Sequence, residues 1–130
     1  MNKRCVGAIL SGWMVWSTAA SAAPLPTTPG QCSETTIRKI GERLEDGATG
    51  QPIAGSGSAV SFANRGYQVS YDDVAAIRHS RAGDRVRICL VKLPTDCPRG
   101  DNRGRVYTTT NLRTGQSWTL PDSEHSCGGA

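Results

Sequence analysis

Histidine chemistry in this chain depends on two residues, His79 and His125. His125 ends the segment 122–125, Asp-Ser-Glu-His, which holds a nucleophile, a base and two carboxylic acids. Neighbours on one short segment cannot converge as a hydrolytic triad does, since triad members arrive from separate elements of a fold. We therefore predict no catalytic residues. The alternative is a small hydrolase of envelope polymers, in which His125 works with a carboxylate such as Asp101 or Asp122.

Two other groups contain side chains that bind metals in other proteins. His125 and Cys127 have a spacing that suits a soft metal if the thiol is reduced. Asp96, Asp101 and Asn102 place three oxygen donors in one loop, and calcium prefers such donors. The EF-hand register is missing around them, and Asp and Asn ordinarily stabilise turns in polar loops. We predict neither a metal site nor a cofactor.

Arginine side chains are the best candidates for a ligand surface. Arg85 and Arg87 are two apart on one expected strand, and Arg105 and Tyr107 are two apart on the next. If the strands form a hairpin, the four side chains can lie in one patch. Guanidinium groups beside an aromatic ring suit an anionic or sugar-like ligand. The leading hypothesis is a non-catalytic domain that binds a protein or an anionic envelope partner.

The N-terminus has the layout of a secretory signal peptide. Lys3 and Arg4 precede an apolar run of about 12 residues, which is followed by small residues. A spanning helix needs about 20 residues, so we predict cleavage after Ala22 and no membrane span in the mature chain. Loss of Lys3 and Arg4 lowers the net charge from +4 to +2, which argues against a nucleic-acid partner. The expected location is the periplasm or the extracellular space.

Four cysteines follow the predicted cleavage point, and an even number in a small exported domain indicates two disulfides. A strand running on from Cys89 advances about 3.3 Å per residue. Too few residues then remain for the chain to return to Cys97, because bridged Cα atoms lie within about 7 Å of each other. This argues against Cys89–Cys97 and leaves two of the three possible connectivities. Of these we favour Cys32–Cys89 with Cys97–Cys127.

The elements that carry these residues are mostly strands. Residues 23–31 contain three prolines and predict a flexible linker before one domain over 32–130. The segment after Cys32 fits a helix with the stripe Ile37, Ile40 and Leu44, or a bulged strand with Gly41 at the irregular position. We favour the strand because the segments that follow it are β.

Apolar and polar residues alternate through the rest of the chain, as in half-buried strands. The residues expected to share one face of a strand are Val60 and Phe62, then Tyr67, Val69 and Tyr71, then Val86, Ile88 and Leu90, then Trp118 and Leu120. Of these, Trp118 is predicted to lie inside. Residues 72–77 predict a short helical turn. Residues 94–104 predict a loop, and the tail after 120 is expected to be held only by Cys127. The predicted fold is all-β, a small disulfide-stapled antiparallel barrel or sandwich.

Four strings in the second half of the chain are specific as sequences: GDRVRICLV, CPRGDNRGRVY, NLRTGQSW and PDSEHSCGGA. In these strings the chain resembles a group of small exported bacterial proteins of uncharacterised function. They cover about a third of the sequence. The resemblance implies export and a disulfide-held β domain, and it implies no activity.

Overall fold

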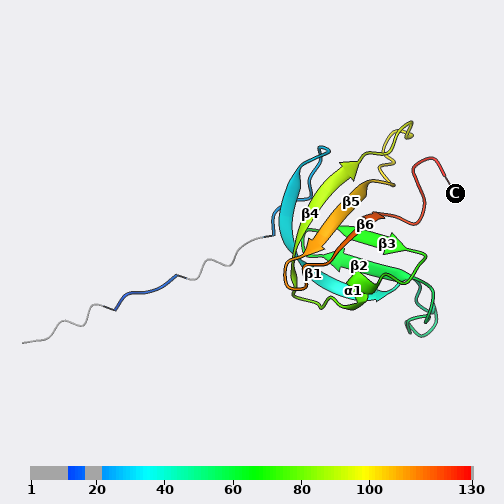
Figure 1. The fold of residues 1–130 in the computed structure, drawn as a ribbon. Helices are drawn as coiled ribbons and strands as arrows, with labels where there is room; N and C mark the ends of the chain where they lie inside the picture. Colours follow the sequence, from blue (N-terminus) through cyan, green and yellow to red (C-terminus); the bar gives the residue numbers. More distant parts are fainter. Residues whose placement is uncertain (1–11, 17–21, 130) are drawn as a thin grey trace, which may run out of the picture.

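Six antiparallel strands and one short helix make up the domain (Figure 1). The computed structural model of the chain describes residues 12–16 and 22–129. In chain order the elements are β1 (Cys32–Glu42), β2 (Ser58–Phe62), β3 (Tyr67–Ser70), α1 (Ala75–Arg78), β4 (Arg85–Lys92), β5 (Val106–Asn111) and β6 (Ser117–Pro121). The strand order β3-β2-β1-β4-β5-β6 forms one sheet that curls into a half-barrel. The predicted all-β, disulfide-stapled class is confirmed.

Strand β1 joins the two halves of this sheet. Its residues 32–36 pair with β4, and its residues 37–42 pair with β2. A register irregularity between Ile37 and Lys39 marks the change of partner, and such bulges bend a strand and increase its twist. The strand interpretation of this segment is right. The irregularity was expected at Gly41, which instead pairs regularly with Ala59, because the bend is needed where β1 changes neighbour.

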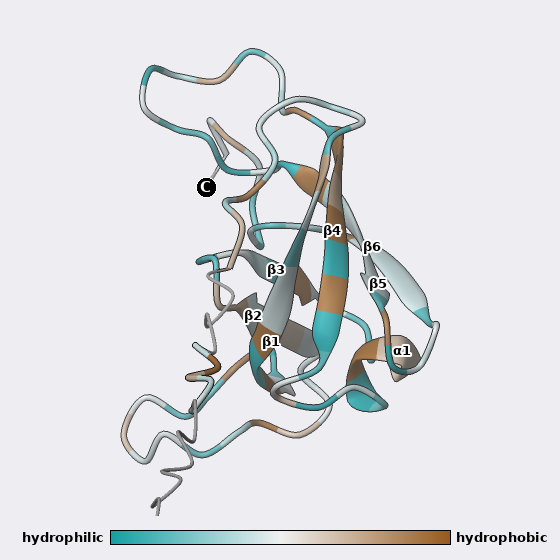
Figure 2. Cartoon of the chain, turned by 90° about the vertical axis from the view of Figure 1, so that its left-hand side faces the viewer, coloured by the Kyte–Doolittle hydropathy of each residue, from teal (hydrophilic) through white to brown (hydrophobic). Residues whose placement is uncertain are grey.

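The inner face of the half-barrel holds the hydrophobic core. Strand β4 lies between β1 and β5 and alternates apolar and polar residues along its length (Figure 2). Its inward side chains pack with residues of the other strands and of α1 in one buried cluster: Ile37, Val60, Phe62, Ile77, Val86, Ile88, Leu90, Tyr107 and Trp118. Burial of Trp118 was predicted and is confirmed, since this side chain is 5% exposed.

Strand β3 buries two successive residues, Gln68 and Val69. Tyr67 and Tyr71, which alternate with Val69 in the sequence, are exposed. Aromatic residues alternate with polar ones here, and alternation alone does not say which set faces inward. Gln68 takes the inward position because it has polar partners there, which are described below.

Two disulfides staple the sheet and the loops at one end. Cys32–Cys89 joins β1 to β4, and Cys97–Cys127 joins the loop before β5 to the C-terminal tail. Both predicted bridges are confirmed, and two bridges are typical of proteins in an oxidising, extracellular-type environment. The tail was expected to be held by Cys127 alone. It is also held by the ion pair between Glu124 and Arg43, whose guanidinium lies 4.3 Å from the ring centre of Tyr71.

Residues 22–30 form an arm that runs beside the first part of β1 and turns back into it (Figure 1). The backbone N–H of Ala23 donates to Glu34 at 3.3 Å, and that of Gly30 donates to Leu90 at 2.8 Å. Pro26 is buried and Leu25 packs against the core. These contacts occur in the segment whose composition predicted a flexible linker. Most of the predicted signal peptide lies outside the described residues, and none of the helices in the described part is long and apolar enough to cross a membrane.

Candidate functional site

The four residues predicted to form one ligand patch lie on two faces of the sheet. Arg87 pairs with Thr110, and Leu90 pairs with Tyr107. Paired residues in antiparallel strands share a face, and successive residues alternate between faces. Arg87 therefore points outward while Tyr107 points into the core, where it is 2% exposed. The predicted patch of Arg85, Arg87, Arg105 and Tyr107 is wrong as a single surface.

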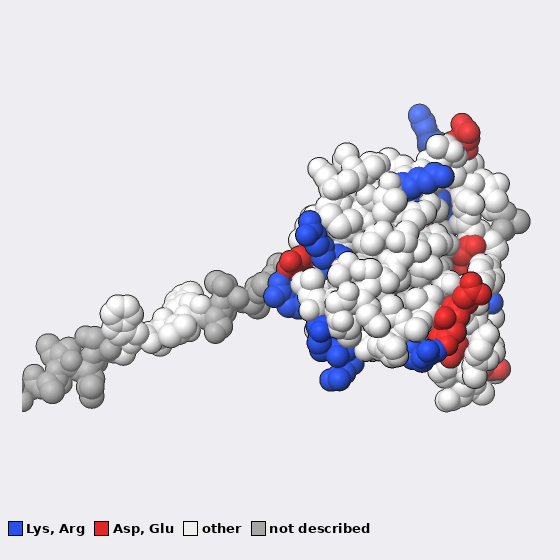
Figure 3. Space-filling view, viewed as in Figure 1, with Lys and Arg blue, Asp and Glu red and all other residues white. Residues whose placement is uncertain are grey.

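The register across the loop 94–104 explains this error. Strand periodicity tells which residues share a face within one strand, but a long loop sets the register between two strands. Here the β4–β5 pairing also shifts between Leu90 and Lys92. On the outer face Arg85 forms an ion pair with Glu34. Figure 3 shows basic side chains around the margin of one face, separated by a wide uncharged area.

Arg105 and Tyr107 instead line a hollow on the inner side of the half-barrel, which we call the Tyr107 hollow. Its volume is about 190 Å³. The arm, the β2–β3 turn, the start of β5 and the segment after β6 meet around it. The lining residues are Leu25, Phe62, Arg65, Gly66, Tyr67, Gln68, Ile88, Arg105, Tyr107 and Asp122.

One wall of the hollow is fixed by Gln68. Its amide nitrogen donates to the carbonyl oxygens of Tyr107 at 2.7 Å and Leu120 at 3.1 Å. Its amide oxygen accepts from the Thr109 hydroxyl at 2.6 Å and from the Trp118 indole N–H at 2.8 Å. The side chain thus joins the edge strand β3 to β5 and to the opposite edge strand β6. All of its hydrogen-bonding capacity is used.

The hydroxyl of Tyr107 has no such partner. It is buried, and no described residue forms a hydrogen bond with it. A buried polar group is nearly always paired in a folded protein, and an unpaired one calls for an explanation such as a ligand or a water molecule. Since Tyr107 lines the hollow, its hydroxyl is a candidate donor for a group that enters there.

Two arginines contribute positive charge to the same hollow. The side chains of Arg65 and Arg105 form no ion pair and no hydrogen bond with any residue in the described part of the chain. The Asp122 carboxylate also lines the hollow. Its Oδ1 accepts from the backbone N–H groups of Gly104 at 2.8 Å and Arg105 at 3.1 Å, and it forms no ion pair with the Arg105 guanidinium. Burial raises the pKa of Tyr67, assisted by the nearby Glu124 carboxylate, so this phenol remains a donor.

Arg65 also has an unusual backbone. Its φ is +68° in the turn between β2 and β3, a left-handed conformation that glycine and asparagine adopt more readily than arginine. Residues held in this way cluster at functional sites, where the surrounding structure compensates for their strain. The turn therefore carries an arginine at a position that would suit glycine, and that arginine lines the hollow.

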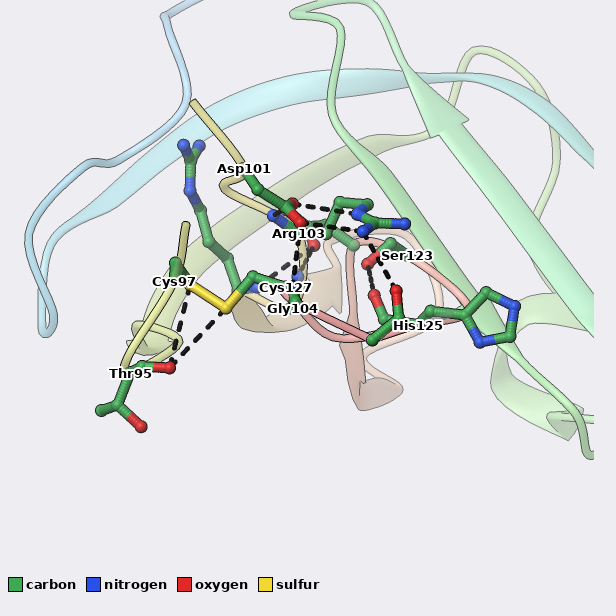
Figure 4. The surroundings of a disulfide bond; sticks show 12 residues. Thr95, Cys97, Asp101, Arg103, Gly104, Ser123, His125 and Cys127 are labelled. Atoms are coloured by element: carbon green, nitrogen blue, oxygen red, sulfur yellow. Dashed lines mark hydrogen bonds and ion pairs between the residues drawn. A yellow bond between two sulfur atoms is a disulfide. The ribbon is translucent and has the colours of Figure 1, made fainter. Parts of the chain in front are cut away.

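The alternative site built on His125 does not assemble. Figure 4 shows its ring pointing away from Ser123, whose hydroxyl donates to the backbone carbonyl of His125 at 2.6 Å. Neither imidazole hydrogen-bonds a carboxylate of a described residue; His79 contacts Gln116 through Nδ1 at 3.1 Å. The predicted pairing of His125 with Asp101 or Asp122 is therefore absent from this structure.

The loop carboxylates have structural partners. Asp101 accepts from Arg103 at 2.8 Å and from the backbone N–H of Gly128 at 3.0 Å, and these bonds, led by Arg103, hold its pKa well below its usual value. Its carboxylate thereby ties the loop to the tail beside the disulfide (Figure 4). Among residues 12–16 and 22–129 no group of three or more His, Cys, Asp or Glu side chains could hold a metal ion.

A second polar cluster lies under the β5–β6 turn. Arg113 donates twice to Asp84, from Nε at 2.7 Å and from Nη2 at 2.8 Å, and the buried Asn111 donates to Asp84 at 2.9 Å. The Arg113 guanidinium, followed by the Asn111 amide, holds the pKa of Asp84 well below its usual value. Because the polar groups of this cluster hydrogen-bond one another, we assign the cluster a structural role.

Sequence reasoning placed Arg105 and Tyr107 in a ligand site and missed Arg65 and Gln68. A signal for Gln68 was present, because glutamine in a short strand between β-formers needs an internal partner if it faces the core. No local signal indicated that Arg65 would reach the start of β5. No protein-family model, no curated protein and no solved structure matches the chain.

Proposed function

We propose that this chain is an exported, non-catalytic β domain whose Tyr107 hollow binds an anionic group of a protein or envelope partner. One observation carries the proposal. The hollow combines two arginines that have no acidic partner among the described residues with a buried tyrosine hydroxyl that has no hydrogen-bond partner there. Carboxylate and phosphate groups accept hydrogen bonds from such donors, and these charge-assisted bonds are about twice as strong as neutral ones.

The size of the hollow supports a projecting group as the ligand. Its volume of about 190 Å³ lies below the roughly 300–1,000 Å³ of pockets that enclose a drug-sized molecule. A side chain or a terminal anionic group of a larger partner fits such a space. This agrees with a binding domain whose partner stays largely outside the half-barrel.

The rigid wall also supports binding. Gln68 is held by four hydrogen bonds, so the hollow is formed before a ligand arrives. Binding to a pre-organised site avoids the entropy loss of ordering side chains. The export part of the proposal is supported by the two disulfides and by the signal-like layout of residues 1–22.

The test is an NMR titration of the purified protein with acetate, phosphate and N-acetylglutamate. We expect saturable shifts of the Tyr107 ring and of the Gln68 side-chain amide. Arg105→Gln should weaken binding at least about tenfold, since a hydrogen bond to a charged group contributes about 1.5–3 kcal/mol. Tyr107→Phe removes one oxygen and should weaken binding without loss of the fold.

Two further variants complete the test, one as a control and one at the second arginine of the hollow. Arg38→Gln removes an exposed arginine from the β1 bulge, whose side chain forms no ion pair with a described residue, and it should leave binding unchanged. Arg65→Gly should weaken binding while the stability changes by no more than about 1 kcal/mol, because glycine tolerates the positive φ. Equal weakening by Arg38→Gln and Arg105→Gln would show general charge attraction and refute the site.

A further inference from the structure

We infer that the arm, residues 22–30, is an exchangeable part of the wall of the Tyr107 hollow, and that an extended peptide segment of a protein partner replaces it. The inference rests on the proposed function, because it names the class of partner whose anionic group enters the hollow. It concerns a different part of the ligand, namely the peptide backbone and an aliphatic side chain.

The arm borders the hollow through one apolar side chain, and one backbone carbonyl of the arm is hydrogen-bonded beside it. Leu25 lines the hollow and lies so close to Gly66 that a Cβ on that glycine would come within 3.1 Å of Leu25 Cδ2. The side-chain amide of Asn64 donates to the carbonyl of Ala23 at 3.0 Å. A side chain at position 66 would crowd Leu25, so glycine favours the close approach of the leucine. Asn64, in the turn before β3, binds the carbonyl of Ala23, two residues before Leu25.

The same arm is a poor complement to the polar groups beneath it. Thr35 is 4% exposed and lines a crevice together with Ala22 and Ala23, yet its hydroxyl has no hydrogen-bond partner among the described residues. The Tyr107 hydroxyl is in the same state. Pro24 and Pro26 cannot donate to either hydroxyl, because proline has no backbone N–H. A segment that fits in shape and leaves buried hydroxyls unpaired is one that a better partner can replace.

The geometry defines that better partner. It is an extended peptide with an aliphatic side chain in the place of Leu25 and with N–H groups where the arm has prolines. A carboxylate next to the aliphatic residue would reach Arg65 or Arg105, which the arm leaves without an anion. The arm itself contains no acidic residue between positions 22 and 30, and its only contribution to the lining of the hollow is the apolar side chain of Leu25.

The experiment uses the peptide acetyl-Ala-Ala-Ala-Leu-Glu-Ala-Thr-amide and its Leu-to-Ser form, titrated into the purified protein by NMR. The chain variant Leu25→Ser weakens the internal competitor, and Thr27→Ser is the matched control at an exposed position of the same arm. The apparent affinity of a ligand falls in proportion to the fraction of protein molecules whose site is open. If the arm covers the site in about nine-tenths of the molecules, Leu25→Ser should bind the leucine peptide about tenfold more tightly. The serine peptide should not bind.

A second measurement keeps the test independent of the folding of Leu25→Ser. In the unaltered protein, saturating leucine peptide should shift the Leu25 methyl resonances toward the values of an exposed leucine. Unchanged Leu25 methyl resonances with bound peptide would overturn the inference, and so would equal affinity of Leu25→Ser and Thr27→Ser for the leucine peptide. Absence of any peptide binding would overturn it as well.

The two proposals can fail separately. A peptide with Gln in place of Glu tests the anion part. If the Glu and Gln peptides bind equally and both displace Leu25, the proposed anion site is wrong and the exchange stands. If acetate and N-acetylglutamate bind while no peptide displaces Leu25, the exchange is wrong and the anion site stands.

Discussion

Replacement of Gln68 by leucine would test whether one side chain joins the two edges of the half-barrel. The change keeps the volume and removes four hydrogen bonds. The Trp118 indole N–H and the Thr109 hydroxyl would lose their acceptor in a site where Thr109 is 0% exposed. The carbonyls of Tyr107 and Leu120 would lose only a second donor.

The magnitude follows from the two orphaned donors. Each buried unsatisfied group costs about 1–3 kcal/mol, or roughly 2–6 kcal/mol together. Burial of leucine in place of an amide returns about 1 kcal/mol of this at most. We expect Gln68→Leu to lower the free energy of unfolding by about 1–5 kcal/mol, compared with the roughly 5–15 kcal/mol typical of a domain. The measurement is guanidinium unfolding with disulfides intact, followed by circular dichroism.

Gln68→Glu makes the explanation sharper, because it changes one atom. At neutral pH a carboxylate would face two carbonyl oxygens in a buried site, which raises its folded-state pKa above the unfolded value of about 4.3. A raised pKa means that the stability of this variant, compared with Gln68→Leu, is greatest below about pH 4 and falls as the pH rises. If Gln68→Leu unfolds within about 1 kcal/mol of the unaltered protein, or if Gln68→Glu shows no such pH dependence, the bridge does not hold the edges together.

Three other predictions follow from the contacts of the folded chain. Arg113 and Asn111 lower the pKa of Asp84 from 3.8. The contribution of this carboxylate to stability is therefore present above pH 3.8 and is lost as the pH falls below that value. In the Asp84→Asn variant, the melting temperature should consequently change less with pH in the acid range. Mass spectrometry with alkylation should find no free thiol among Cys32, Cys89, Cys97 and Cys127 in native protein, and two or more alkylated thiols would contradict the stapled fold. The Cys97→Ser, Cys127→Ser double variant should lose roughly 3–4 kcal/mol in the chain-entropy account, and its amide exchange should rise in the tail while β4 and β5 stay protected.

Local sequence patterns predicted the elements better than their arrangement. Alternation identified β4 and the burial of Trp118, because a half-buried strand must place every second side chain in the core. Cysteine geometry excluded one of the three possible connectivities, because the reach of a short segment rules out a pairing without knowledge of the fold. These inferences depend on distances along the chain that are short enough for covalent geometry to limit them.

The misplaced ligand patch shows where such limits end. Between Arg87 and Arg105 lie a strand end with a shifted register and the loop 94–104. A one-residue change of register moves a whole strand's side chains to the other face, so the relative faces of Arg87 and Tyr107 depended on tertiary packing. The arm is a similar case. Its prolines correctly indicated that it forms no strand of the sheet, but its packing depends on tertiary contacts of Leu25 near Gly66 and Phe62.

Some buried polar groups of this small core have hydrogen-bond partners and others have none. This difference agrees with the proposed binding site beside the arm. Gln68, Asn111 and Thr109 are buried and hydrogen-bonded to neighbouring strands and turns. The hydroxyls of Ser33, Thr35 and Tyr107 are buried and have no partner in the described part of the chain. Thr35 lines the crevice beside Ala22 and Ala23, and Tyr107 lines the hollow that Leu25 also lines. Unpaired buried groups reduce stability, so a fold can retain them only where something else is gained. Binding of an anionic, peptide-like partner at the arm would satisfy the hydroxyls of Thr35 and Tyr107 together with Arg65 and Arg105, which form no ion pair with a described residue.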